Sequence, residues 1–281
     1  MVFSYNCYAK INLFLHINGK RPDGYHNLQS LFSPINLYDV LYLQKSPRFC
    51  LNIVGKYQQQ LSATQHNIIT KIWQYCLENF QLDSNLTITL QKNIPVGAGL
   101  GGGSSNGTAF LLAVNKLFSL QLNTSQLLEI SLKFGSDLPF FLLGKPALVF
   151  GRGEEVVPLE KPLAKPLPKL PILLINPQIN LSTALVFAKN SNFSQPLAVD
   201  YLQNLDFMGL LALGNDLEKS AISLLPEIAE ILACLNKFQP LTAKMSGSGS
   251  SCFAVFTNKT TCRAGYIWFR QNFPQYFVKM L

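Results

Sequence analysis

Glycines and hydroxyl residues are concentrated in one stretch of the chain, Pro95-Val-Gly-Ala-Gly-Leu-Gly-Gly-Gly-Ser-Ser-Asn106. The stretch follows a strand-like alternating segment, residues 86–91, and precedes an apolar segment with helical spacing that starts at about Ser105 and ends near Phe118. Glycine tolerates positive φ and has no Cβ to keep a ligand away. Amide N–H groups can then converge on an anion at the positive end of the following helix, so the stretch predicts a phosphate-binding loop.

This loop is not of the Walker A type, because no Lys-Ser or Lys-Thr follows its glycines. The pattern Gly97-x-Gly99-x-x-Gly102 also occurs in dinucleotide-binding folds, which need an acidic residue about 20 positions later to hold a ribose. The first acidic residue after the loop is Glu129, inside the next helical segment, so a dinucleotide site is disfavoured. A turn without a ligand is disfavoured as well, because so many glycines cost backbone entropy.

Two charged residues stand in apolar surroundings. Lys10 and Asn12 lie two apart on one face of an alternating segment, where a lysine is by default exposed to solvent. Asp137 lies in the turn Gly135-Ser-Asp-Leu-Pro139 and is flanked by phenylalanines. Its carboxylate could simply brace the turn. An acid amid so much aromatic surface is better explained by a partner, either a cation or a substrate hydroxyl.

Two further turns are candidates for ligand contact. The segment Met245-Ser-Gly-Ser-Gly-Ser-Ser-Cys252 is a second glycine loop, which could approach a ligand or form a plain hairpin. Tyr25 and His26 follow Asp23-Gly24 in a turn, and for them a binding role competes well with a purely structural one.

Composition excludes several classes of protein. A chain of 281 residues suits one or two domains, and with 48% hydrophobic residues it is not disordered. The formal charge of +8 is spread over scattered lysines and arginines, so it fits a mildly basic enzyme for anionic small molecules as well as it fits a nucleic-acid-binding protein. The six cysteines show no C-x-x-C pair and no zinc spacing, so free thiols in a reducing compartment are expected. With neither a signal peptide nor a transmembrane run, a cytoplasmic protein is expected.

The periodicity predicts a mixed chain of helices and strands. Beyond the helix after the phosphate-binding loop, helices are expected at 68–80, 125–134, 182–189, 199–213, 227–237 and the C-terminus. Strands are expected at 8–13, 31–37, 40–43, 86–91, 147–150, 172–176 and 252–256. Five prolines in residues 158–171 favour an extended segment, and its start predicts a domain boundary, giving domains 1–157 and 158–281.

Three motifs, in order, resemble the signatures of the GHMP small-molecule kinases: Tyr8-Ala-Lys-Ile-Asn-Leu13, residues 95–106, and Ser246-Gly-Ser-Gly-Ser250. The resemblance runs over nearly the whole chain, and its small departures, Gly107 and Thr108, lie where alanines are more usual. It implies a two-domain α+β fold, with a ribosomal-S5-like N-terminal domain, a ferredoxin-like C-terminal domain and an active site between them.

The resemblance also implies roles for individual residues. The donor ATP would rest on the phosphate-binding loop, with Mg²⁺ near the hydroxyl of Ser104 or Ser105, of which Ser105 is assigned to the metal. The residues assigned to ATP are Pro95, Val96, Gly97, Ala98, Gly99, Leu100, Gly101, Gly102, Gly103, Ser104 and Ser105. Asp137 would take the proton of the acceptor hydroxyl, and Lys10 would stabilise the developing charge.

For the acceptor, the turn around Tyr25 and the segments at 135–141 and 215–218 are similar to GHMP kinases that act on a cytidine-diphosphate-linked branched alcohol. The residues assigned to this acceptor are Asn12, Tyr25, His26, Thr183 and Phe187. Tyr25 and Phe187 would hold the cytosine between their rings, with His26 at the base edge. From the residues alone, the preferred interpretation of Phe187 is a core residue of its helix.

Two other functions are weighed against this one. Another GHMP kinase, for homoserine or mevalonate, is disfavoured by the Asp-Gly-Tyr25-His26 turn. A nucleic-acid-binding protein with an S5-like fold is disfavoured by Lys10, Asp137 and the complete phosphate-binding loop. The expected partner is therefore a small molecule, with no nucleic acid and no membrane, and the expected state is a monomer or weak homodimer.

Overall fold

The computed structural model describes residues 2–61, 63–159 and 170–281, which form two compact units. The first unit comprises Met1–Lys10, Pro34–Val96 and Gly101–Lys145, and the second comprises Ile11–Ser33, Gly97–Leu100 and Pro146–Leu281. The N-terminal strands and the phosphate-binding loop contribute residues to both units. The units are therefore interleaved along the sequence.

A six-stranded sheet contains the N-terminal strands. Its members are β1 (Phe3–Lys20), β2 (His26–Ser46), β3 (Cys50–Val54), β4 (Asn85–Gln91), β5 (Ala147–Phe150) and β6 (Glu155–Pro158). The order is β3-β4-β2-β5-β6, with β1 paired to β2. β3 and β4 run parallel, as strands joined by a crossover helix do, whereas β2 pairs antiparallel with β4 and with β5.

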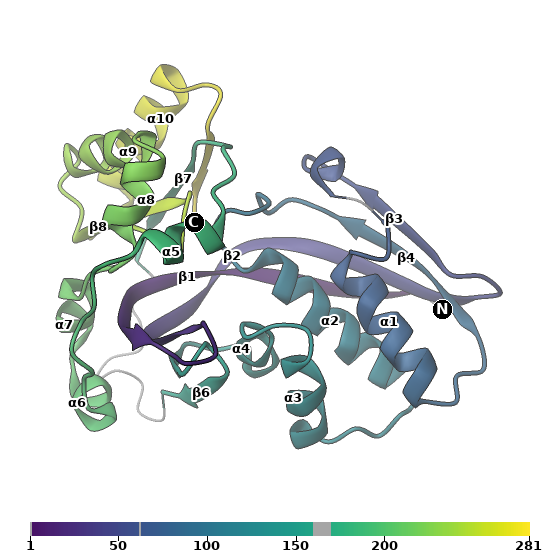
Figure 1. The fold of residues 1–281 in the computed structure, drawn as a ribbon. Coiled ribbons are helices and arrows are strands. Elements are labelled where there is room, and N and C mark those ends of the chain that lie inside the picture. Colours follow the sequence, from purple (N-terminus) through teal and green to yellow (C-terminus); the bar gives the residue numbers. More distant parts are fainter. Residues whose placement is uncertain (1, 62, 160–169) are drawn as a thin grey trace. The chain divides into compact units, whose positions relative to one another are not determined.

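Helices of the first unit pack against one face of this sheet, where α1 and α2 lie side by side (Figure 1). They are α1 (Ile68–Asn79), α2 (Gly102–Leu117), α3 (Thr124–Leu132) and α4 (Leu138–Leu143), with a 3-10 helix, η1 (Gln58–Gln60). Trp73 of α1 and Phe110 of α2 meet edge to face in the core, beside Leu41 and Ile88 of the sheet. The Asn67 side chain caps α1 by accepting the amide of Ile69.

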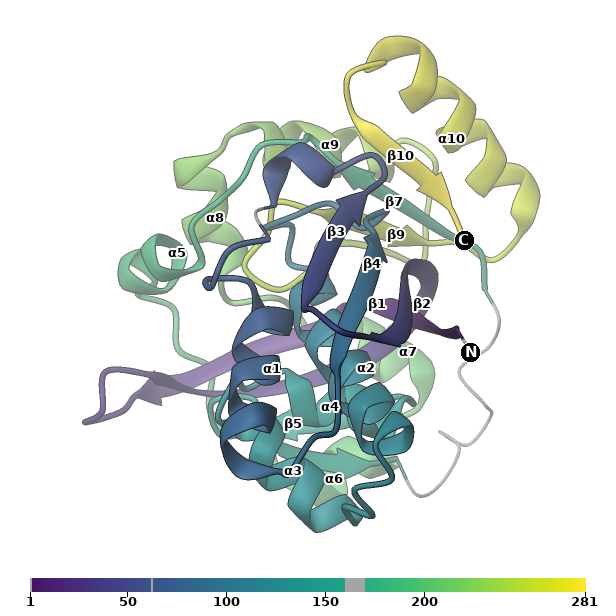
Figure 2. The same cartoon turned by 90° about the vertical axis from the view of Figure 1, so that its right-hand side faces the viewer.

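The second unit contains a four-stranded antiparallel sheet. Its strands, in the order β10-β7-β9-β8, are β7 (Ile172–Asn176), β8 (Thr242–Met245), β9 (Cys252–Val255) and β10 (Phe277–Met280). Its helices are α5 (Thr183–Lys189), α6 (Val199–Asn204), α7 (Phe207–Ala212), α8 (Glu218–Leu224), α9 (Glu227–Asn236) and α10 (Lys259–Asn272). Figure 2 shows α10 alongside β10. None of the helices within the described ranges is long and apolar enough to cross a membrane.

Most of the predicted elements are confirmed. The helices expected at 68–80, 125–134, 182–189 and 227–237 are α1, α3, α5 and α9, and the strands expected at 86–91, 147–150, 172–176 and 252–256 are β4, β5, β7 and β9. The two strands expected at 31–37 and 40–43 are one strand, β2. Pro34 is tolerated there because it lies between the residues that pair with β5 and those that pair with β4.

The single helix predicted over 199–213 is wrong, because the segment forms two short helices, α6 and α7. Leu205 between them is extended, with φ −61° and ψ 137°, and ends α6. The Asp206 side chain then accepts the amide of Gly209 and caps α7. Apolar periodicity continues through both helices, so it could not reveal the break.

The predicted boundary at residue 157/158 stays a prediction. Most of the proline-rich segment on which it rests, residues 160–169, lies outside the described residues. The compact units are divided elsewhere, since β1 and the phosphate-binding loop each pass from one unit to the other.

Candidate active site

The phosphate-binding loop has the backbone conformation that its glycines predict. Gly97, Gly99 and Gly101 have φ values of +61°, +73° and +67°, in the left-handed region that favours glycine. Gly101 is the N-cap of α2, and the first intrahelical bond runs from the Ser105 amide to the Gly101 carbonyl, 2.9 Å. The amides of residues 102–104 precede that bond and are available to an anion at the positive end of the helix.

The glycines of this loop serve different purposes. A Cβ on Gly99 would lie 2.1 Å from the carbonyl oxygen of Ser246, so Gly99 is required by the packing of two backbones in the second unit. A Cβ on Gly102 would lie 2.9 Å from the Lys92 ammonium. Only Gly103, which is exposed, would point a Cβ into space free of other described atoms within 4 Å. The expectation that the glycines admit a ligand therefore fits Gly103 best.

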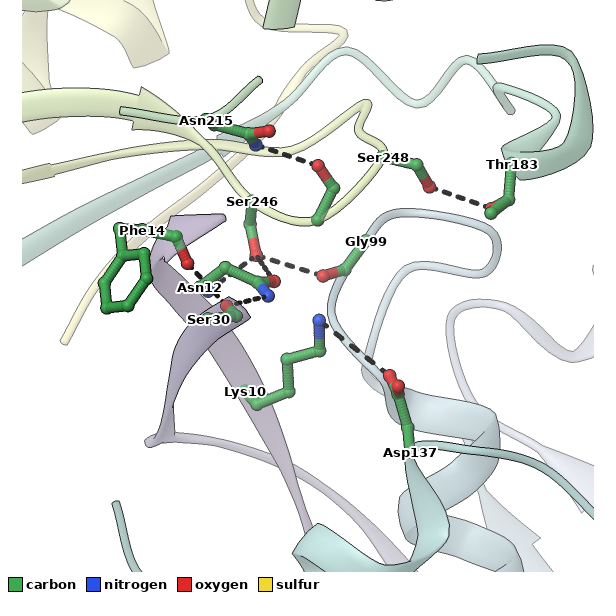
Figure 3. Close-up of polar contacts among 11 residues, drawn as sticks. Lys10, Asn12, Phe14, Ser30, Gly99, Asp137, Thr183, Asn215, Ser246 and Ser248 are labelled. Atoms are coloured by element: carbon green, nitrogen blue, oxygen red, sulfur yellow. Dashed lines mark hydrogen bonds and ion pairs between the residues drawn. The ribbon is translucent and has the colours of Figure 1, made fainter. Parts of the chain in front are cut away.

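Lys10 and Asp137 are brought together in the first unit, from β1 and from the residue before α4 (Figure 3). The Lys10 Nζ lies 3.9 Å from the Asp137 Oδ2, and the side chains are 5% and 32% exposed. Burial lowers the pKa of Lys10, and the Asp137 charge opposes that shift. Although Asp137 is the N-cap of α4, its side chain makes no capping hydrogen bond, so the carboxylate does not cap that helix.

The default expectation of an exposed Lys10 is wrong, because β1 is buried on both faces from Ala9 to Leu15. Lys10 also lies against the start of α2, where a Cβ on Gly101 would be 3.1 Å from its Cγ. The Lys10–Asp137 pair and the positive end of α2 are therefore neighbours within one unit.

The two departures from the family pattern have local explanations. A Cβ on Gly107 would lie 2.8 Å from the Cδ1 of Ile68, so Ile68 occupies the space of the usual alanine methyl. The Thr108 hydroxyl donates to the carbonyl of Leu138, 3.0 Å, and is buried. This bond ties α2 to the residue that follows Asp137.

In the second unit, Asn12 lies in a buried network of hydrogen bonds (Figure 3). Its amide nitrogen Nδ2 donates to the Ser30 hydroxyl, 2.9 Å, and Ser30 donates to the carbonyl of Phe14. The Ser246 hydroxyl accepts the Asn12 backbone amide, 3.3 Å, and donates to the Gly99 carbonyl, 3.0 Å. The three motifs that carried the family resemblance thus meet through Asn12, Gly99 and Ser246.

The second glycine loop, residues 245–252, is the hairpin loop between the antiparallel strands β8 and β9, and side chains from other segments hold it in place. The Asn215 side chain donates to the carbonyls of Met245 and Gly247, both at 2.9 Å. The hydroxyls of Thr183 and Ser248 are 2.8 Å apart, so Thr183 at the start of α5 contacts this loop (Figure 3).

Aromatic side chains gather around His26 in the second unit. The centroid of the His26 ring lies 5.2 Å from that of the Phe187 ring. The His26 ring is also stacked on the Phe193 ring, with 6.3 Å between the centroids. Tyr25 is 57% exposed, with the Arg152 guanidinium 5.0 Å from its ring centroid. Burial lowers the pKa of His26, and the Lys20 charge lowers it further, so its imidazole is neutral at pH 7.

The structure does not support the alternative that Phe187 is a core residue of its helix. The residue of α5 that enters the core is Val186, and Phe187 is half-buried. Two residues of this aromatic group, Phe193 and Arg152, escaped the sequence analysis. Phe193 stands in a polar segment where a lone aromatic residue was a usable signal, whereas Arg152 meets Tyr25 only through the fold.

For the expected Mg²⁺, no cluster of three or more His, Cys, Asp or Glu side chains suited to a metal occurs among the described residues. A magnesium ion that arrives with ATP needs few protein ligands, because it is held mainly by phosphates and water. Of the two hydroxyls considered, Ser104 is half-exposed and Ser105 is 3% exposed, so accessibility favours Ser104.

Comparison with known proteins gives two family matches. Residues 67–145 match the model of the GHMP kinases N terminal domain, and residues 199–263 match that of the GHMP kinases C terminal domain. These matches and the arrangement of helices and sheets confirm the expected two-domain α+β fold.

Whole-chain similarity is more specific. A protein from Chelativorans sp. (strain BNC1) named 4-diphosphocytidyl-2-C-methyl-D-erythritol kinase is 34% identical, over 96% of this chain and 92% of its own length. A crystal structure of 4-(cytidine 5'-diphospho)-2C-methyl-D-erythritol kinase superposes with a TM-score of 0.80 at 30% identity, covering 99% of this chain and 98% of that one. L. major mevalonate kinase, with a TM-score of 0.68 at 17% identity, shares the fold alone.

Proposed function

The chain belongs to the GHMP kinase family, and from that membership we propose that it transfers the γ-phosphoryl group of ATP to the 2-hydroxyl of 4-diphosphocytidyl-2-C-methyl-D-erythritol. This reaction belongs to the non-mevalonate pathway to isoprenoid precursors. The observation that carries the proposal is the pairing of Lys10 with Asp137 beside the first turn of α2. A proton acceptor, a cation and a set of free amides are the parts that phosphoryl transfer requires.

The acceptor is a tertiary alcohol, which is crowded and weakly acidic. Its oxygen forms the new bond to phosphorus, the bond from phosphorus to the ADP oxygen breaks, and the hydroxyl proton passes to the Asp137 carboxylate. Lys10 offsets the negative charge on the oxygens of the transferring group, and its burial strengthens that interaction. Asn12, two residues along β1, helps to orient the acceptor.

ATP rests on the loop from Pro95 to Ser105, with its phosphates at the amides that begin α2. The positive φ values of the glycines and the open space above Gly103 support this placement. Ser104 or Ser105 would supply the hydroxyl ligand to a Mg²⁺ ion bound with ATP, and that ion would neutralise phosphate charge.

The cytidine end of the acceptor binds the aromatic group of the second unit. Tyr25 and Phe187 are the stacking surfaces, and His26 supplies the hydrogen bond to the base edge. The exposed ring of Tyr25 and the half-buried ring of Phe187 support this assignment, because an aromatic ring that stacks on a ligand cannot be enclosed in the core. Thr183, near this group at the start of α5, completes the acceptor site.

Location and assembly follow from the same proposal. All six cysteines are free thiols, which suits the reducing cytoplasm where ATP is available. A monomer or weak homodimer is expected, because the reaction needs one copy of each group named above.

The decisive experiment is a coupled ADP-release assay with matched acceptors. The purified protein receives MgATP and, in parallel, 4-diphosphocytidyl-2-C-methyl-D-erythritol, mevalonate or homoserine. We expect turnover with the cytidyl acceptor and none above background with the other two. Turnover with mevalonate or homoserine alone would place the protein in another branch of the family, and ADP release without any acceptor would contradict kinase specificity altogether.

A further inference from the structure

A buried carboxylate lies beneath the phosphate-binding loop, in the first unit. Asp39 of β2 is 0% exposed, and both of its oxygens are engaged. Its Oδ1 accepts the backbone amides of Asn93 and Ile94, at 2.7 and 2.8 Å. Its Oδ2 accepts the Lys92 ammonium and the side-chain amide of Asn106, the latter at 2.9 Å. Asp39 therefore accepts hydrogen bonds from four donors in two separate segments, residues 92–94 and Asn106.

We propose that Asp39, Lys92 and Asn106, here called the Asp39 brace, are positioning residues that hold the phosphate-binding loop in its ATP-binding conformation. Lys92, Asn93 and Ile94 come directly before the loop, and Asn106 lies in α2, directly after it. One carboxylate thus ties the two ends of the loop to each other and to β2. This proposal rests on the proposed function, in which the loop binds ATP.

Lys92 acts through the loop and is not itself a phosphate ligand. Its side chain is 3% exposed, and its ammonium donates both to Asp39 and to the Oδ1 of Asn106, 3.2 Å. A Cβ on Gly102 would lie 2.9 Å from that ammonium, so Lys92 fills the space behind the first residue of α2. A lysine next to a glycine-rich loop suggests a phosphate-binding lysine, but this one is turned away from solvent.

The paired charge of the brace explains why Lys92 is tolerated there. An uncompensated cation is unfavourable at the N-terminus of a helix. Asp39 cancels the charge of Lys92, and the amides that begin α2 then keep their attraction for the phosphates of ATP. Removing either partner alone would leave a buried unpaired charge and endanger the fold. The test therefore uses paired substitutions.

Two double variants separate hydrogen bonding from charge. Asp39→Asn with Lys92→Met removes both charges but keeps an oxygen for the amides of residues 93 and 94, and rotation of the Asn106 side-chain amide lets its Oδ1 accept the new amide donor. Asp39→Leu with Lys92→Met removes the hydrogen bonds as well. We expect the first to keep the Kd for MgATP within about threefold of wild type, and the second to raise it roughly tenfold or more, with an unchanged Kd for the cytidyl acceptor.

Calorimetric titration with MgATP and with the cytidyl acceptor measures both constants, alongside thermal unfolding. The control is Lys45→Met with Asp83→Asn, which removes an exposed ion pair of the same unit and should change neither constant. An unchanged MgATP Kd in folded Asp39→Leu/Lys92→Met protein would overturn the proposal. Equal losses in both double variants would also overturn it, because the charge of Lys92 would then act on phosphate directly.

If Asp39→Leu/Lys92→Met does not fold, Asn106→Ala gives the same readout by releasing only α2 from the brace. A rise in the MgATP Kd of roughly three- to tenfold supports the proposal, and no rise overturns it. Failure of the proposed function would appear differently, as wild-type protein that binds no MgATP or phosphorylates no cytidyl acceptor.

Discussion

Lys10 and Asp137 form a pair in which water reaches only one partner, since the Lys10 side chain is 5% exposed and the Asp137 side chain is 32% exposed. Burial lowers the pKa of the enclosed Lys10 ammonium, and the charge of the more accessible Asp137 carboxylate opposes that shift. The separation of 3.9 Å leaves Asp137 free to turn toward that hydroxyl without giving up the attraction of Lys10.

Asp137→Asn is therefore expected to lower kcat by roughly 10²–10⁴-fold, the usual contribution of a positioned proton acceptor, with KM for ATP and for the acceptor within a few-fold. The coupled ADP-release assay measures all three values. Asp83→Asn, which removes a 72% exposed carboxylate paired with Lys45, is the matched control and should leave kcat unchanged. Turnover near that of wild type in Asp137→Asn protein would remove this residue from the mechanism.

Tyr25→Ala tests the acceptor site. Stacking of a base on an aromatic ring contributes on the order of 1–3 kcal/mol, so KM for the cytidyl acceptor should rise by roughly ten- to a hundredfold while KM for ATP stays nearly constant. Tyr201→Ala, at a similarly exposed tyrosine of α6, is the control. A rise in KM for ATP with no change for the acceptor would mean that the Tyr25 turn serves the nucleotide donor.

At the scale of elements, α2 is the helix whose first turn we propose as the phosphate site, and the glycines at its start are constrained from several sides. Gly101 and Gly102 face Phe141 and Lys92 so closely that a larger residue would displace protein atoms. A substitution at either position would therefore change the folding of the protein as well as its affinity for ATP, and the two effects could not be separated. Gly103 escapes this difficulty, because a methyl group there meets only open space.

Gly103→Ala should stabilise the protein while weakening ATP binding. Alanine loses less backbone entropy in a helix than glycine, so unfolding free energy should rise by up to about 1 kcal/mol. The added methyl keeps phosphates from the amides, so the Kd for MgATP should rise by roughly ten- to a hundredfold. Denaturant unfolding and calorimetry give the two values, with the exposed Gly214→Ala as control. A stabilised protein with wild-type ATP affinity would show that phosphates bind elsewhere.

At the scale of the whole molecule, stability depends on pH through His16, which is buried on β1 beside Phe14. Its Nδ1 finds no hydrogen-bond partner within the part of the chain that the structure describes. Burial lowers the pKa of His16 from 6.5, Lys244 lowers it further and Asp216 opposes the shift. The folded protein therefore binds the proton less readily than the unfolded chain does.

The contribution of His16 to stability is complete above the unfolded pKa of 6.5 and is lost progressively as the pH falls from that value through the lower pKa of the folded state. His16→Phe removes the titrating group and keeps an aromatic ring beside Phe14. The fall in Tm between about pH 7.5 and about pH 5.5 should be smaller in this variant than in wild type. His66→Gln, at an exposed histidine, should retain the wild-type difference. Equal pH dependence in wild type and His16→Phe would exclude His16 as its source.

The sequence by itself determined the features that depend on neighbours along the chain. The glycines of residues 97–101 predicted left-handed backbone, and φ is positive at Gly97, Gly99 and Gly101, since only local sterics decide it. Apolar spacing predicted α1 and β4 closely for the same reason. Motif order was enough to indicate the family, because the three motifs are each continuous in sequence.

Only the tertiary structure decided which distant residues meet. It enclosed Lys10, although alternation on β1 indicated an exposed face, because both faces of that strand are covered. It placed Gly99 against the backbone of Ser246, and it paired Lys92 with Asp39, which lies 53 residues away in the sequence. The burial of a side chain and its partners depend on packing between segments that are distant in the sequence, and no local pattern specifies that packing. The sequence therefore shows that a residue is charged, but it does not show the environment of the charge.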